Sequence, residues 1–257
     1  MLRIRSADNS DFSHISRLCS HSVLGTKIMC QIGAYGLDKS FFSVWLCTDS
    51  DEILGIICKL EDDITLIYSS EENTEDIRTS VDMIGYSSVC CTYEMALKLE
   101  YECFTTKKAY FYAGKHIGEM CDEITENHYR DAYSLICRNI PGSFSDTKEA
   151  YLSFLSDFTY RRRRGMARIK GFTERNEVIS CALTSAETEQ AAIISGVACD
   201  SMHRKSGLGK NTVLSLAEEL HKENKTVYVI ALNESAEGFY EHIGFEFKEK
   251  ISFIERK

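Results

Sequence analysis

The sequence predicts an α/β fold in which a mixed central sheet carries helices on both faces. Short apolar runs of strand length recur along the chain, and they alternate with segments whose apolar residues follow helical spacing. This alternation occurs in each half of the 257 residues. Strands that alternate with helices are typical of sheets covered by helices, so the pattern favours α/β over an all-helical or all-strand protein.

The first half opens with a short alternating strand followed by a helix. Three strand patterns come next, the first two around a polar turn at residues 48–51. The predicted elements are a strand at 2–5, a helix ending at Cys19, strands at 42–46, 53–60 and 63–68, helices at 75–84 and 93–102, and a strand at 109–113.

A boundary between two halves is predicted over Gly118–Ile124, where the apolar periodicity lapses. Helical and strand patterns resume after it, and they include a hairpin that carries Glu174 and Glu177. The predicted elements are helices at 125–138 and 148–158, a strand at 191–199, a helix from about 208, a strand at 225–232, a short helix after Asn233 and a strand at 246–254.

A glycine loop between the strand at 191–199 and the following helix predicts an anion site. The first backbone N–H groups of a helix lack intrahelical partners, and the helix dipole favours negative charge there. Gly207 and Gly209 let the backbone approach a pyrophosphate without an intervening Cβ. Arg204, Lys205 and Lys210 add cationic charge around the same loop.

Comparison of the loop with known phosphate-binding motifs limits the classes of ligand that it could bind. The Walker pattern fails, because Lys210 is followed by Asn211 and the position five before Gly209 is not glycine. The dinucleotide fingerprint fails as well, since residue 212 is Thr. Arg204, Gly207 and Gly209 do fill the pattern [R/Q]-x-x-G-x-[G/A]. This loop resembles the acyl-CoA loop of the GNAT superfamily of acyl-CoA-dependent N-acyltransferases.

A second motif strengthens the resemblance. The segment from Asn233 to Phe245 is similar to the family signature N-x-x-A-x-x-[FL]-Y-x-x-x-G-F at every marked position. The two motifs also stand in the family's order. The resemblance is specific over about residues 165–257 and extends to 125–164 by pattern alone.

The resemblance implies a co-substrate and a set of site residues. The co-substrate is acetyl-CoA or another acyl-CoA, bound without a metal. Tyr240 would protonate the departing CoA thiolate, and Asn233 would contact the pantetheine arm or the acyl carbonyl. The residues expected to bind the co-substrate are Val197, Cys199, Arg204, Lys205, Ser206, Gly207, Leu208, Gly209, Lys210 and Asn233.

Each of these side chains also has a structural interpretation. Tyr240 could be a core aromatic residue of a short helix. Asn233 is a residue that a helix N-cap would choose, and it could serve both purposes. Arg204 could be a solvated loop charge whose backbone matters more than its guanidinium. The run Arg161–Arg164 could be a solvated loop, or it could hold the 3′-phosphate of CoA.

The general base is left unassigned. Many family members carry a Glu on the strand before the loop, where this chain has Ile193 and Ile194. Asp200 and Glu189 stand at the two ends of that strand, and Glu174 and Glu177 lie on the preceding hairpin. The expected activity is transfer of an acetyl group to a primary amine by direct attack on the thioester. The alternative is a catalytically silent regulatory protein that binds acyl-CoA.

Composition predicts a cytoplasmic protein without a membrane span. No apolar stretch reaches about 18 residues, and the first residues lack the apolar core of a secretory signal. The 11 cysteines are scattered and form no C-x-x-C pair. Neither disulfides nor a metal site are therefore expected. Residues 1–126 carry 11 Lys and Arg against 21 Asp and Glu, which argues against nucleic acid binding. The expected partner is a small-molecule or peptide amine, and a homo-oligomer is left open.

The first half resembles a degenerate GNAT repeat. Its element order is similar to that of the family, but no glycine loop of the acyl-CoA type stands at the matching place. The sequence therefore predicts a tandem arrangement. Residues 1–120 would form a half without a cofactor loop, and residues 121–257 the catalytic, acyl-CoA-binding domain.

Overall fold

The computed structural model describes residues 2–37, 39–50, 52–114, 118–140 and 144–256. The chain divides into two compact units. The first unit contains Met1–Ala109 and Lys248–Lys257, and the second contains Tyr110–Phe247. The assignment of a cofactor-free half to residues 1–120 and a catalytic half to 121–257 stays a prediction.

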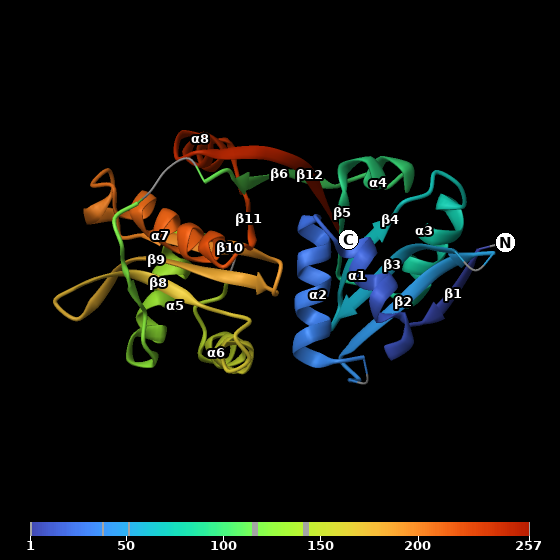
Figure 1. The fold of residues 1–257 in the computed structure, drawn as a ribbon, viewed down its shortest axis with the longest axis horizontal. Helices are drawn as coiled ribbons and strands as arrows, with labels where there is room; N and C mark the ends of the chain where they lie inside the picture. The colour runs from blue at the N-terminus through green and yellow to red at the C-terminus, as the bar shows by residue number, and fades with distance from the viewer. Residues whose placement is uncertain (1, 38, 51, 115–117, 141–143, 257) are drawn as a thin grey trace. The chain divides into compact units, whose positions relative to one another are not determined.

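The first unit contains a mixed sheet in the order β1-β2-β3-β4-β5-β12, which continues into the first five residues of β6, Thr105–Ala109 (Figure 1). Neighbouring strands are antiparallel except for β4 and β5, which run parallel. Its elements are β1 (Arg3–Ser6), α1 (Phe12–Cys19), α2 (Val23–Tyr35), β2 (Phe42–Asp49), β3 (Glu52–Leu60), β4 (Asp63–Tyr68), α3 (Thr74–Ile84), β5 (Ser88–Thr92), α4 (Tyr93–Lys98) and β12 (Phe245–Glu255).

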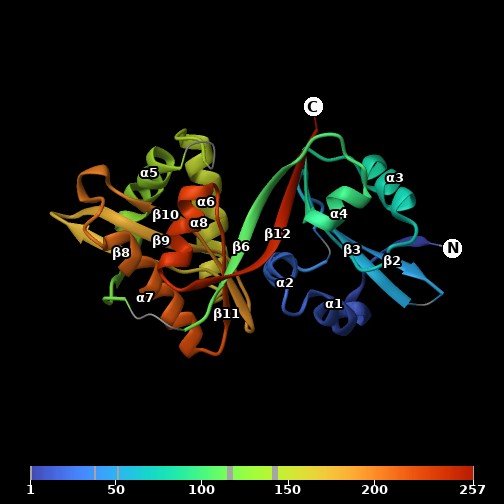
Figure 2. The same ribbon diagram turned by 90° about the horizontal axis from the view of Figure 1, so that it is seen from above.

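Two apolar clusters cover the two faces of this sheet. Neighbouring residues of one strand belong to different clusters: Ile56 of β3 packs with α1 and α2, whereas Ile57 packs with α3 and α4. This is the expected consequence of the two-residue period of a strand. Figure 2 shows the helix pair α1 and α2 on one face and the pair α3 and α4 on the other.

The second unit has a sheet in the order β6-β11-β10-β9-β8-β7. The pair β10 and β11 is parallel, whereas β9 is antiparallel to both β8 and β10. Its elements are β6 (Thr105–Tyr112, of which the last three residues belong here), β7 (Asp122–Glu123), α5 (Tyr129–Asn139), α6 (Lys148–Arg162), β8 (Ile169–Glu174), β9 (Glu177–Glu187), β10 (Ala191–Cys199), α7 (Leu208–Lys222), β11 (Thr226–Ile230) and α8 (Glu234–His242).

Helices again lie on both faces of the second sheet. Cys181 and Leu183 of β9 pack in the cluster of α5 and α6, whereas Ala182 between them packs in the cluster of α7 and α8. The predicted fold class, a mixed α/β sheet with helices on both faces, is therefore confirmed in each unit. Among the described residues, no helix combines the length and the apolar character needed to cross a bilayer.

Most predicted elements are found, and the failure to predict α2 and β5 has a clear reason in each case. The strands at 63–68 and 191–199 are confirmed with their predicted bounds. Helix α2 was not predicted: eight of its thirteen residues are buried, so no polar stripe marks it, although Ser22 caps its N-terminus through Gly25 N. Strand β5 has five residues, too few for a periodic signal.

Strands β6 and β12 each contribute residues to both units. Ile251 and Ile254 of β12 are buried, and Ile254 belongs to the α3 and α4 core of the first unit. Tyr110 and Tyr112, at the end of β6, are buried in the α7 and α8 core of the second unit. The C-terminal strand β12 therefore belongs to the sheet of the first unit, where it pairs with β5.

A buried ion-pair network closes one end of the second unit. Glu187, at the end of β9, is fully buried, and a buried carboxylate requires compensating cations. Arg168, just before β8, pairs with Glu187 at 2.5 Å, with Glu219 at 2.7 Å and with Glu223 at 2.8 Å. Lys170 pairs with Glu219 at 2.5 Å. Lys225 pairs with Glu187 at 2.6 Å and with Glu223 at 3.0 Å.

This network predicts an acid-sensitive stability. The hydrogen bond from Arg168, supported by Lys225, lowers the pKa of Glu223 from 4.5 to about 2. A carboxyl whose folded pKa is depressed contributes stability above its unfolded pKa, and that contribution is lost as pH falls towards the folded pKa. The free energy of unfolding, measured in urea, should therefore fall between pH 4.5 and about 2. Glu223→Gln should flatten this slope, whereas Glu234→Gln, in the exposed first turn of α8, should leave it unchanged.

Candidate functional site

Strand β10 extends beyond its parallel partner. The parallel register joins Ala191–Ile194 to Thr226–Val229. Strand β11 ends at Ile230, whereas β10 continues to Cys199 along β9. The last five residues of β10 therefore lie past the register with β11, where the sequence predicts that backbone groups can bind a pantetheine arm.

A β-bulge lies within this part of β10. Ser195 pairs with Leu183 and Ala198 pairs with Cys181, so Gly196 and Val197 together oppose a single residue of β9. Gly196 has φ 57°, and a Cβ there would lie 3.0 Å from Ile136 Cδ1. The positive φ favours glycine, and a side chain at this position would have to displace Ile136 slightly. Gly196 was missed by sequence reasoning, although an isolated glycine within a strand pattern is a known bulge signal.

The loop after β10 folds into a compact turn. The side chain of Asp200 accepts the N–H of Met202 and so caps a short 3₁₀ turn, Ser201–His203. Ser206 Oγ donates to His203 O at 2.5 Å. Lys205 at φ 65° and Gly207 at φ 89° then take left-handed conformations that direct the chain into α7.

The N-terminus of α7 has the features of an anion cradle. Gly207 occupies the N-cap, no side chain caps the helix, and its first turn contains no acidic residue. A Cβ built on Gly207 would meet no atom within 4 Å, and one on Gly209 would come no nearer than 3.8 Å to Cys199 Cβ. The N–H groups of Leu208, Gly209 and Lys210 precede the first intrahelical donor, Asn211, which bonds Gly207 O. These residues therefore fit a pyrophosphate.

The charged side chains around the loop differ in their partners. Arg204 Nη2 donates to Asn139 Oδ1 at 2.6 Å. His203 Nε2 lies 3.2 Å from Glu174 Oε2 at the end of β8.

Burial raises the pKa of the Cys199 thiol and the nearby Asp200 raises it further, although a hydrogen bond from Gly209 N–H opposes this. Both raising effects favour the neutral thiol, which is a poorer nucleophile than the thiolate.

Asn233 caps helix α8. Its Oδ1 accepts the N–H of Ala236 at 3.0 Å, so the N-cap interpretation of this residue is confirmed. The residue is exposed. Its amide nitrogen is not the atom that caps the helix, so the cap is compatible with a second contact to a ligand.

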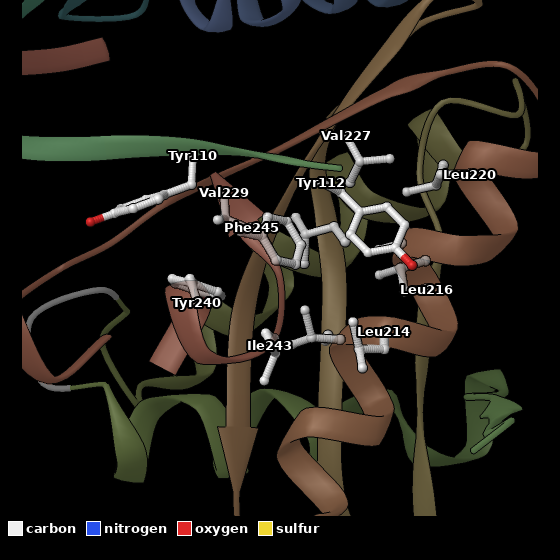
Figure 3. Close-up of a cluster of buried hydrophobic side chains, with 14 of the residues drawn as sticks. Tyr110, Tyr112, Leu214, Leu216, Leu220, Val227, Val229, Tyr240, Ile243 and Phe245 are labelled. Carbon is white, nitrogen blue, oxygen red and sulfur yellow. The ribbon is translucent and has the colours of Figure 1, made fainter. Parts of the chain in front are cut away.

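Tyr240 lies in the core between α7, α8 and the sheet. Its side chain is only 7% exposed, and its ring contacts Phe239, Phe245 and Tyr110 at centroid distances of 5.3, 5.6 and 6.5 Å. Figure 3 shows Tyr240 below Tyr110 and beside Phe245. Burial raises the pKa of Tyr240 to about 12. The phenol therefore keeps its proton at neutral pH.

The four candidate bases occupy different positions. Asp200 caps the 3₁₀ turn, and Glu174 pairs with His203, so both lie at the loop. Glu177 begins β9 at the same hairpin. Glu189 precedes β10 and thus stands at the strand end remote from the loop.

The arginine run at the end of α6 is bound to its own surroundings. Arg161 is buried and pairs with Asp157 at 2.8 Å, Arg162 pairs with Glu123 at 2.8 Å, and Arg164 lies over the ring of Tyr160. Arg161 also donates to Ser185 O, in the half of β9 remote from the glycine loop. The solvated-loop interpretation is therefore wrong for Arg161.

Comparison with known families extends these observations. The family described as FR47-like protein matches residues 171–254, which include β10, the glycine loop, α7, α8 and most of β12. The chain has the fold of the GNAT superfamily. No curated protein sequence matches it.

Solved GNAT structures are similar over almost the whole chain. An acetyltransferase of the GNAT family from Colwellia psychrerythraea has a TM-score of 0.63 at 13% identity, covering 99% of this chain and 100% of its own. A tandem GNAT protein from the clavulanic acid biosynthesis pathway has a TM-score of 0.62 at 12% identity, with 99% and 98% covered. A GCN5-related N-acetyltransferase from Sphaerobacter thermophilus has 0.62 at 13%, with 99% and 95% covered.

The GNAT fold accounts for the arrangement of the site. The fold brings three features to one end of the second sheet: the part of β10 beyond the register with β11, the glycine loop at the start of α7, and the start of α8 after β11. Among the described residues, no group of His, Cys, Asp and Glu is arranged to hold a metal ion.

Proposed function

We propose that this protein is an N-acyltransferase that transfers an acetyl or other acyl group from acyl-CoA to the primary amine of a small molecule or peptide. The observation that carries this proposal is the junction of β10 and α7. There, a strand that outruns its parallel partner leads through a glycine loop into a helix N-terminus without a side-chain cap. The GNAT fold and the FR47-like match support it.

The binding roles follow from backbone geometry. The N–H groups of Leu208 and Lys210 would bind the pyrophosphate, and that of Gly209 would do so in exchange for its bond to the Cys199 thiol. The positive end of the α7 dipole adds to the attraction. Polar backbone groups of Val197 and Cys199, past the end of the β11 register, would pair with pantetheine amides. Asn233 would contact the same arm through its amide nitrogen. Bound in this way, acyl-CoA supplies an activated thioester that the amine can attack.

Tyr240 would give its phenolic proton to the departing thiolate. An acid must be protonated when it acts, and the raised pKa of about 12 ensures this across the working pH range. The same shift makes the phenol a weaker acid than free tyrosine. A backbone N–H of β10 near the bulge at Gly196 would stabilise the developing oxyanion, as fixed dipoles do in acyl transfer.

A silent acyl-CoA-binding protein is the second candidate. Two observations favour it: β10 presents Ile193 and Ile194 where many family members carry a base, and Tyr240 packs as a core aromatic residue. Binding of acetyl-CoA without thiol release across a panel of amines would support this candidate. Calorimetric binding of acetyl-CoA followed by amine-dependent thiol release would support the enzyme.

Tyr240→Phe tests the role of the phenol as the acid within the enzyme candidate. If the phenol is the acid, kcat should fall by about 10²–10⁴-fold while the Kd for acetyl-CoA changes little, because general acid catalysis contributes about this much. Between pH 7 and 10, wild-type kcat should not decline, because Tyr240 deprotonates only near pH 12. Initial rates of thiol release measure both effects.

Tyr112→Phe is the matched control for this substitution. It removes a hydroxyl from the same core, where Tyr112 contacts Phe245 at 5.4 Å. Its kcat should stay near the wild-type value. Equal losses in the two variants would mean that the core packing, and not the phenol of Tyr240, sustains turnover.

A further inference from the structure

Two adjacent side chains leave the 3₁₀ turn before α7 in different directions. His203 reaches Glu174 at the end of β8, with 3.2 Å between Nε2 and Oε2. Arg204 reaches Asn139, the last residue of α5, with 2.6 Å between Nη2 and Oδ1. The start of the glycine loop is therefore tied on both sides to elements outside the loop.

The acceptor for Arg204 is held in place before any ligand binds. Asn139 Nδ2 donates to Leu135 O at 2.8 Å, one turn back in α5, which orients Oδ1 towards the guanidinium. The guanidinium also lies at the C-terminus of α5, where a cation is favoured by the helix dipole. A hydrogen bond from a charged donor is stronger than one between neutral groups, and an acceptor that is fixed in advance reduces the entropy lost when the bond forms.

Because Arg204 stands just before the glycine loop, its bond to Asn139 affects the backbone conformation at the start of α7. Arg204 is extended at φ −64°, ψ 151°, and the next residue, Lys205, is left-handed at φ 65°. Gly207 follows at φ 89° and opens α7. These dihedral angles decide where the N–H groups of the first helical turn point, so an anchor at Arg204 fixes the direction of those donors.

We propose that Arg204 acts in acyl-CoA binding as a positioning residue held by Asn139, and not as a cation on the pyrophosphate. The cationic charge facing the ligand then comes from Lys205 and Lys210. Asn139, which no motif includes, becomes part of the binding apparatus through Arg204. The inference rests on the proposed function, because it assumes that the loop binds acyl-CoA.

A double-mutant cycle tests this role. The Kd for acetyl-CoA would be measured by calorimetry for Asn139→Ala, Arg204→Gln and the double variant. Each single substitution should raise the Kd about three- to tenfold, which is the range of an ordinary hydrogen bond, because solvent weakens the charged bond at this exposed site. The double variant should be no weaker than the single ones, since residues that act through one bond are not additive.

Charge and position are separated by two further measurements. Arg204→Lys keeps the charge but loses the fork that reaches Asn139, so it should bind as poorly as Arg204→Gln. The salt dependence of the Kd should be unchanged in Asn139→Ala and Arg204→Gln, and it should decrease in Lys210→Gln, because salt screens a charge that faces the ligand. Arg17→Gln, an exposed arginine on α1 of the first unit, is the matched control and should bind as wild type.

A ligand-free measurement keeps the inference separate from the proposed function. Hydrogen exchange of the amides at residues 205–210 should be faster in Asn139→Ala than in wild type. Wild-type affinity in Asn139→Ala, or retained affinity in Arg204→Lys, would overturn the positioning role while leaving acyl-CoA binding intact. Absence of acetyl-CoA binding by the wild-type protein would instead overturn the proposed function and this inference with it.

Discussion

Gly207→Asp should abolish acetyl-CoA binding while leaving the protein folded. The new carboxylate would stand at the N-cap of α7, where the pyrophosphate is expected to bind. Like charges about 4 Å apart repel by about 4 kcal/mol at the effective dielectric of a protein surface, so the Kd should rise at least about a hundredfold. A side chain at φ 89° adds strain, but no neighbouring atom obstructs it.

Gly165→Asp is the matched control for this result. Gly165 also has a positive φ, 69°, and a Cβ there would meet no atom within 4 Å, but it follows α6 and lies outside the glycine loop. The backbone cost is therefore similar and the ligand effect should be absent. Calorimetry gives the Kd, and thermal unfolding verifies that both variants are folded. A Gly207→Asp protein that binds acetyl-CoA as wild type does would refute the assignment of the loop.

Ile251→Asp should unfold the first unit, although the substitution lies only six residues before the last residue of the sequence. Ile251 is fully buried in β12 and pairs with Thr92 of β5. An unpaired buried carboxylate costs several kcal/mol, and the loss of the isoleucine adds about 2–5 kcal/mol. Together these approach the total stability of a domain, about 5–15 kcal/mol.

The matched control is Lys248→Asp, an exposed residue on the same strand. It should leave the free energy of unfolding within about 0.5 kcal/mol of wild type. Limited proteolysis followed by mass spectrometry should locate the first cleavages of Ile251→Asp within residues 1–109. Cleavage confined to residues 110–247 would show that β12 does not stabilise the first unit.

Local patterns determined the fold class and the position of the candidate site. The strand at 191–199, the glycine loop and the start of α7 are contiguous in the sequence, and each is specified by its own residues: a β-branched apolar run, two glycines and a helical repeat. The N-cap role of Asn233 was also predicted, because a cap bonds a donor only three residues away. Signals of this range survive without knowledge of the tertiary fold.

The tertiary structure alone decided features that join residues distant in sequence. Arg204 and Asn139 are 65 residues apart, Arg168 and Glu223 are 55 apart, and β5 pairs with β12 more than 150 residues later. The sequence of a loop motif does not show whether its arginine faces a phosphate or a helix terminus. The apolar pattern of a strand likewise does not show which strand it pairs with. The sequence by itself thus determined the fold class and most of the helices and strands, since these depend on neighbouring residues. Which strand completes which sheet, and which charge is paired, depended on three-dimensional packing.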